Sequence, residues 1–110
     1  MRRFAWVLAV WPGVVGAQDG PVLSGDAVRI ALEGRRLVYD SGAWQDFRAS
    51  GRTLYHAGAD SWGYWRSRGD QYCSQWPPSD LWACYDVKDV NGGLQFIGAS
   101  GEVTGAVYDD

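Results

Sequence analysis

The chain has 110 residues, of which 21% are charged and 46% hydrophobic, and its formal net charge is −3 at pH 7. This length suits one domain, and the acidic balance argues against nucleic-acid binding, which needs clustered cations. Two cysteines and one histidine are too few for a structural zinc site, which takes four such ligands. We therefore expect no nucleic-acid partner, no metal and no other cofactor.

The first seventeen residues have the pattern of a secretory signal peptide. Arg2 and Arg3 form a basic start, residues 4–16 are mostly apolar, and small residues precede a cleavage site after Ala17. The apolar stretch is shorter than the roughly 20 residues that a transmembrane helix needs. We expect cleavage, no membrane span afterwards, and a periplasmic or secreted protein in which residues 18–110 form a single small β-rich domain. An uncleaved anchor or a buried helix is the alternative.

A single short helix is predicted before residue 34. Ser24 and Asp26 offer capping side chains at its start, and Gly34 is a typical stop signal. Apolar residues follow one another with helical spacing between these signals: Ala27, Ile30, Ala31 and Leu32.

From residue 35 onward, short strand-like runs alternate with turn signals such as Ser41-Gly42, Gly69-Asp70 and Asn91-Gly92-Gly93. This even spacing is typical of an antiparallel meander or barrel. We predict a mainly β fold, in which the short N-terminal helix packs on a curved antiparallel meander or a small barrel. The predicted strands cover residues 36–40, 44–49, 53–57, 62–67, 71–76, 82–87, 94–99 and 103–108.

Cys73 and Cys84 are the only cysteines, and an even number in a small exported domain indicates a structural disulfide. If they lie opposite each other on a hairpin, Gln75 faces Trp82 and residues 77–80 form its loop. Directly opposed residues are about 4.5–5.5 Å apart, a separation that a disulfide accepts.

Strand alternation then divides the neighbouring side chains between two faces of the sheet. The face expected in the core carries Trp65, Tyr72, Trp76, Leu81, Ala83, Tyr85 and Val87. The opposite face carries Trp62, Tyr64, Arg66, Cys73, Gln75, Trp82, Cys84 and Asp86.

This region resembles a group of small exported proteobacterial proteins of unknown function. The resemblance covers roughly Asp26 to Tyr108. It is carried by the Ala31-Leu32-Glu33-Gly34 segment before the sheet, and then by Trp62-Gly63-x-Trp65, Tyr72-Cys73, Trp76, Cys84-Tyr85-x-Val87 and a final Phe96…Gly101. In outline the pattern is similar to calycin-type barrels, although there the Gly-x-Trp motif lies on the first strand and here it lies in mid-chain. The resemblance implies a fold and an exported location, and no activity.

No catalytic constellation stands out. His56 is the only histidine, and although Asp60 and Ser61 are close in sequence, no Gly-x-Ser-x-Gly elbow is present. The two glutamates, Glu33 and Glu102, both lie beside glycines at apparent turns. We therefore expect a protein that is not an enzyme and has no catalytic residues.

The aromatic residues suggest a binding function. Trp62, Tyr64, Arg66 and Trp82 are predicted to form an exposed or cavity-lining platform for a small ligand. The alternative structural interpretation is an aromatic ladder that stabilises a thin sheet. A second functional hypothesis is an inhibitor or envelope interaction module, whose partner-binding loop comprises Trp76, Pro77, Pro78, Ser79 and Asp80.

Overall fold

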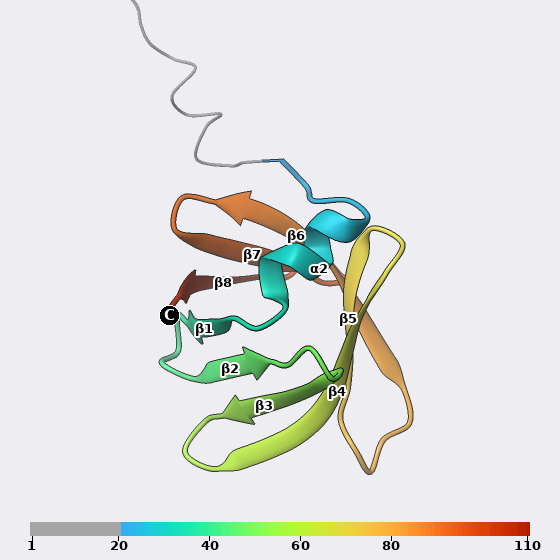
Figure 1. The fold of residues 1–110 in the computed structure, drawn as a ribbon, viewed down its shortest axis with the longest axis vertical. Coiled ribbons are helices and arrows are strands. Elements are labelled where there is room, and N and C mark those ends of the chain that lie inside the picture. The colour runs from blue at the N-terminus through green and yellow to red at the C-terminus, as the bar shows by residue number, and fades with distance from the viewer. Residues whose placement is uncertain (1–20) are drawn as a thin grey trace, which may run out of the picture.

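A closed eight-stranded antiparallel barrel and a short helix make up residues 21–110, the part of the chain that the computed structural model describes (Figure 1). The signal peptide predicted over residues 1–17 lies outside these described residues. The elements in chain order are α2 (Asp26–Leu32), β1 (Arg36–Tyr39), β2 (Trp44–Phe47), β3 (Arg52–His56), β4 (Asp60–Arg68), β5 (Gln71–Gln75), β6 (Trp82–Val90), β7 (Gly93–Ile97) and β8 (Val103–Tyr108).

Each strand pairs with the next one in the chain, and β8 pairs with β1 to close the sheet. The closing register places Leu37 opposite Tyr108 and Tyr39 opposite Ala106. The predicted mainly β fold with one short helix is confirmed for the described residues, and the sheet is a barrel rather than an open meander.

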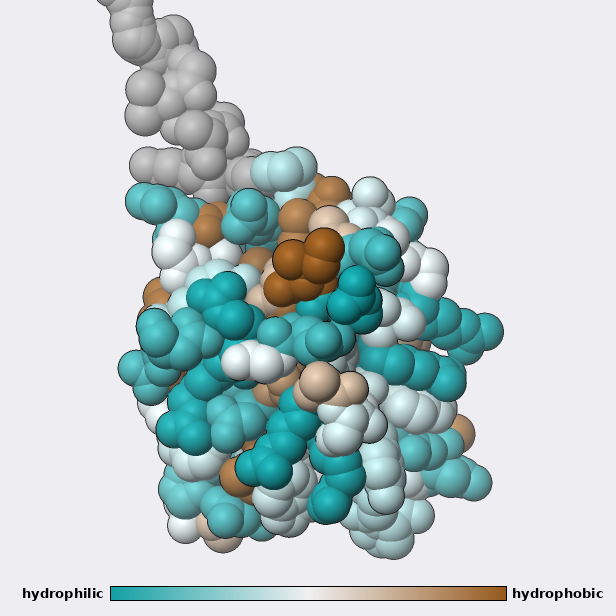
Figure 2. Space-filling model, in the orientation of Figure 1, coloured by the Kyte–Doolittle hydropathy of each residue, from teal (hydrophilic) through white to brown (hydrophobic). Residues whose placement is uncertain are grey.

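Helix α2 packs against β4 and β5 and buries Val28 and Leu32 completely. Ile30 is 66% exposed on this helix, and Figure 2 shows an isolated hydrophobic patch over α2 on an otherwise mostly hydrophilic face. The capping prediction is wrong, because the N-cap residue is Gly25 and no side chain caps the helix. Instead, the Gly25 N–H donates a hydrogen bond to the Asp70 carboxylate at 2.9 Å, which ties the helix start to the β4–β5 turn.

The apolar core fills the barrel interior beneath α2. Its buried residues come from the helix and from seven strands: Val28, Leu32, Leu37, Phe47, Trp65, Tyr72, Val87, Leu94, Phe96 and Ala106. The Phe47 ring is nearly perpendicular to both the Trp65 and the Tyr72 ring, at centroid distances of 5.8 and 5.6 Å. Trp65 also donates its indole N–H to the Arg48 carbonyl at 2.8 Å, so its one polar group is satisfied.

The predicted disulfide hairpin is confirmed in bond and register. Cys73 lies opposite Cys84, their sulfur atoms are bonded at 2.08 Å, and Gln75 lies opposite Trp82. On the other side of β5, Arg66 lies opposite Cys73.

The predicted core face is correct in its centre and wrong at one end. Trp65, Tyr72 and Val87 are buried, but Leu81 is 76% exposed and Ala83 is also exposed. Leu81 precedes the first residue of β6, so strand alternation does not govern its direction. Ala83 pairs with the buried Ser74, but it lies near the barrel end opposite α2, which the helix does not cover.

Replacing both cysteines tests the contribution of the disulfide. We expect Cys73→Ala/Cys84→Ala to lower the free energy of unfolding by about 3 kcal/mol, because the bond restricts the unfolded chain. Urea unfolding of the oxidised protein and of the double variant, followed by tryptophan fluorescence, measures the difference. A change below about 0.5 kcal/mol, the size of an ordinary surface substitution, would contradict this expectation.

Candidate binding site at the open end of the barrel

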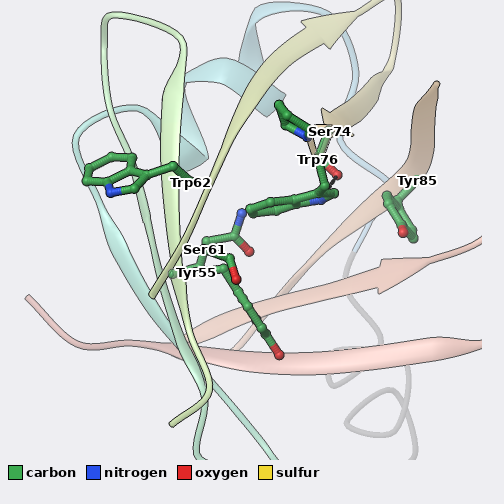
Figure 3. A pocket seen from close by; sticks show the side chains of 8 residues that line it. Tyr55, Ser61, Trp62, Ser74, Trp76 and Tyr85 are labelled. Carbon is green, nitrogen blue, oxygen red and sulfur yellow. Dashed lines mark hydrogen bonds between the residues drawn. The ribbon is translucent and has the colours of Figure 1, made fainter. Parts of the chain in front are cut away.

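The two ends of the barrel differ in what covers them. Because α2 leads directly into β1, the start of β1, the end of β2 and the start of β3 all lie at the α2 end. The opposite end, which we call the open end, holds a pocket of about 530 Å³ (Figure 3). The lining of this open-end pocket comprises Gln45, Tyr55, Ser61, Trp62, Ser74, Trp76, Pro77 and Tyr85.

Trp76 forms a flat wall of this pocket because Gly63 leaves room for its ring. A Cβ atom at Gly63 would lie only 2.5 Å from Cε3 of Trp76, closer than any side chain permits. Two contacts then orient the indole. Its Nε1–H donates to the Ser74 hydroxyl at 3.1 Å, and the Tyr55 ring packs against it at a steep angle, with 6.0 Å between the ring centroids. Figure 3 shows Tyr55, Trp76 and Tyr85 gathered around one space.

A buried polar network forms the floor of the pocket. The Gln45 side-chain amide donates to the Thr53 hydroxyl at 2.9 Å and to the Tyr72 hydroxyl at 3.2 Å, and its carbonyl accepts from the Tyr39 hydroxyl. The Thr53 hydroxyl in turn donates a hydrogen bond to the Asp46 backbone carbonyl at 2.6 Å. Gln45 is 3% exposed, and its three bonds offset the cost of burying an amide. The sequence analysis missed Gln45 as a site residue.

The floor is electrically neutral at ordinary pH. Burial raises the pKa of Tyr72 to about 12, and burial also raises the pKa of Tyr39 well above the ordinary tyrosine value. No carboxylate, lysine or arginine belongs to the pocket lining in the described residues. The pocket therefore offers aromatic faces, hydroxyls and amide groups, and no fixed charge.

A smaller cavity of about 120 Å³ lies between Tyr39, Tyr72, Tyr85, Phe96 and Thr104. Tyr85 lines both spaces, and its ring stacks on Tyr72 at 5.8 Å with 24° between the planes. Tyr85 thus stands between the open-end pocket and this smaller cavity.

The platform predicted from the sequence lies mainly on the outer wall of the barrel. Tyr64, Arg66 and Trp82 do not line the open-end pocket, whereas Trp62 lies at its edge with its ring directed away from Trp76 in Figure 3. Trp62 and Tyr64 are 40% and 44% exposed. The Arg66 guanidinium lies 4.0 Å above the Trp82 ring, so the structure does bring these two residues together.

The residues of the predicted partner loop fall into two groups in the structure. Trp76 and Pro77 line the open-end pocket, while Pro78, Ser79 and Asp80 project as an exposed tip. Two hydrogen bonds shape this tip: the Ser79 N–H donates to the Trp76 carbonyl at 3.1 Å, and the Gln75 amide donates to the Asp80 carbonyl at 2.9 Å.

His56 contacts Asp60 and Trp44, and this arrangement is not a catalytic triad. Its Nδ1 lies 2.7 Å from the Asp60 carboxylate, and its ring stacks on Trp44 at 5.0 Å. In the described part of the chain, no serine is bonded to His56, and no cluster of His, Cys, Asp or Glu could hold a metal ion. The helix in residues 21–110 is neither long nor apolar enough to cross a membrane.

Comparison with protein-family models, with curated proteins and with solved structures found no match to this chain. The resemblance to small exported proteobacterial proteins therefore stays a prediction.

A pH titration tests whether the floor of the pocket is dry and neutral. We expect Tyr72 to stay protonated to about pH 12 in the native protein. The unfolded chain releases this proton near the ordinary value of 10, so the free energy of unfolding is unaffected below that pH and falls as the pH rises from about 10 to 12. Tyrosinate absorbance of native and urea-unfolded protein measures the ionisation. Superimposable titration curves in the two states would contradict the buried network.

Proposed function

We propose that this protein is an exported, non-catalytic binding module that takes one small uncharged ligand into the open end of its barrel. The observation that carries the proposal is the pocket between Tyr55, Trp76 and Tyr85, above the hydrogen-bonded floor at Gln45. Its volume of about 530 Å³ falls within the usual range for small-molecule sites. Eight-stranded barrels are also just wide enough to hold one small ligand.

The lining chemistry favours an aromatic or amphipathic ligand without charge. An ion placed in the pocket would lose hydration and find no charged partner among the lining residues, which is unfavourable. An aromatic ligand could instead lie against Trp76, since ring pairs add about 0.5–1.5 kcal/mol beyond the burial of their area. Ser61, Tyr55 and Tyr85 supply hydroxyls for a few directed hydrogen bonds.

Export is part of this proposal. It rests on the signal-like residues 1–17 and on the Cys73–Cys84 disulfide, because such bonds persist in oxidising compartments.

A matched pair of tryptophan variants tests the location of the ligand site. The probe is N-phenyl-1-naphthylamine, an uncharged aromatic dye whose fluorescence rises in apolar sites. We expect Trp76→Leu to weaken its binding about tenfold by removing the aromatic wall. Trp82→Leu, on the outer wall, should leave it within about twofold of the wild-type protein, because Trp82 does not line the pocket.

An equal loss of dye affinity in both variants, with both still folded, would contradict a binding site at the open end. Loss in Trp82→Leu alone would favour the outer platform predicted from the sequence. Native mass spectrometry of the protein purified from the exported fraction complements this test, since a co-purified mass that dissociates on unfolding identifies the natural ligand.

A second candidate function, recognition of another protein through the β5–β6 loop, is supported by one observation. Leu81 is 76% exposed immediately after the Pro77–Asp80 tip, so a large apolar side chain stands in solvent beside a hydrogen-bonded turn. A central apolar residue on a shaped loop is the kind of anchor that protein partners bury. This function would suit an inhibitor or an envelope interaction protein.

The variant Leu81→Ser separates the two functions. If the loop binds a protein, Leu81→Ser should abolish capture of that protein from envelope extract, while dye binding stays at the wild-type level because Leu81 does not line the pocket. Trp76→Leu serves as the control with the opposite defect. Unchanged capture by Leu81→Ser would exclude Leu81 as the anchor.

A further inference from the structure

Several arginines on the outer surface hold the guanidinium group over an aromatic ring, and two of them also bind an aspartate. Arg35 lies 3.8 Å above the Tyr108 ring and donates to both carboxylate oxygens of Asp110, at 2.7 and 3.0 Å. In the second example, Arg36 lies 3.9 Å above Trp44 and donates to both oxygens of Asp46, at 2.6 and 2.9 Å. The molecule thus contains two complete examples of one carboxylate-binding unit.

Three further arginines have the same stacking but no carboxylate. Arg48 and Arg52 lie 4.8 and 4.5 Å from the centre of the Trp62 ring, and Arg66 lies 4.0 Å from that of Trp82. All three are exposed, and within residues 21–110 none of them forms an ion pair. We call Arg48, Arg52, Arg66, Trp62 and Trp82 the arginine face.

Sheet register places these groups on one continuous part of the barrel wall. Paired residues form a row across β3, β4, β5 and β6. In this row Arg52 lies opposite Tyr64, which lies opposite Gln75, and Gln75 lies opposite Trp82. Arg66 is two residues beyond Tyr64 on the same face of β4, so it lies diagonally beside Arg52, at about 7–8 Å. A partner can therefore contact Arg52 and Arg66 together.

Stacking determines what these arginines can still bind. A guanidinium group lying on a ring keeps its N–H donors in its own plane, and these donors fit the two oxygens of a carboxylate. The same stacking covers ring faces of Trp62 and Trp82, which would otherwise receive a nucleic-acid base.

We infer that the arginine face is a docking site for a carboxylate-rich segment of another protein. Such a segment supplies to Arg48, Arg52 and Arg66 what Asp46 and Asp110 supply to their own arginines. None of the three arginines lines the open-end pocket, and Trp62 is the one residue of the arginine face that also belongs to the pocket lining.

The test uses a short fluorescein-labelled peptide of alternating Glu and Ser, with a peptide in which Gln replaces every Glu as the control ligand. Fluorescence anisotropy at low salt measures binding to the whole protein. We expect the Glu peptide to bind and the Gln peptide to bind at least about tenfold more weakly. The variant Arg48→Gln/Arg52→Gln/Arg66→Gln should weaken binding of the Glu peptide at least about tenfold, through the loss of several exposed charge pairs.

Two matched variants separate stacking from net charge. Arg29→Gln/Arg68→Gln/Lys88→Gln removes the same charge from cations that lie on no aromatic ring in the described structure, and we expect its affinity within about threefold of wild type. Arg48→Lys/Arg52→Lys/Arg66→Lys keeps the charge and removes the planar donors, so it should still bind several-fold more weakly. Urea unfolding followed by tryptophan fluorescence reports that each of the three variants is folded.

Three results would overturn the inference. One is equal affinity for the Glu and Gln peptides. Another is an equal loss of affinity in the two Gln triple variants, which would reduce the effect to general charge attraction. The third is tighter binding of a single-stranded oligothymidine of the same length, which would assign the face to nucleic acid.

Discussion

The pairing of β8 with β1 is the constraint on which the rest of the structure depends. Closure turns one face of every strand inward, so the inner face must be filled with side chains or left as a cavity. Helix α2 fills and covers one end with Val28 and Leu32. Nothing equivalent covers the other end within the described residues, and there the interior widens into the open-end pocket.

The interior changes in character from one end to the other. Beneath α2 the interior is apolar, around Phe47 and Trp65. In the middle, Gln45 and Tyr72 belong to a hydrogen-bonded layer. At the open end, aromatic side chains line the pocket. Tyr72 belongs to two of these layers, because its ring packs on Phe47 while its hydroxyl accepts from Gln45. Stability and the shape of the pocket therefore share residues, and substitutions in the middle layer will change both.

Local sequence patterns predicted the strands and the disulfide register well, because alternation and turn residues are properties of neighbouring positions. The same patterns predicted less well where an element ends and where two residues in contact are far apart in the sequence. The apolar residues with helical spacing included Ile30 and not Val28, whereas tertiary packing exposes Ile30 and buries Val28 completely.

The candidate site was harder to predict because its parts meet only after closure. Gln45 and Tyr85 lie on β2 and β6, and no local pattern relates them. Alternation did place Trp62, Arg66 and Trp82 together on the face opposite the core. It could not show that Arg48 and Arg52 lie on Trp62, since stacking depends on side-chain direction between strands.

Barrel closure also decides how this protein can meet other chains. Every strand from β1 to β8 pairs with a neighbour on both sides. The end of β6 that extends past β5 is paired with the segment around Val22 instead. Closure thus leaves a partner, or another copy, little free sheet edge on which to add a strand, and free edges are the usual template for aggregation. Recognition must pass through side chains and loops, and specificity resides in the outward and open-end residues rather than in the backbone.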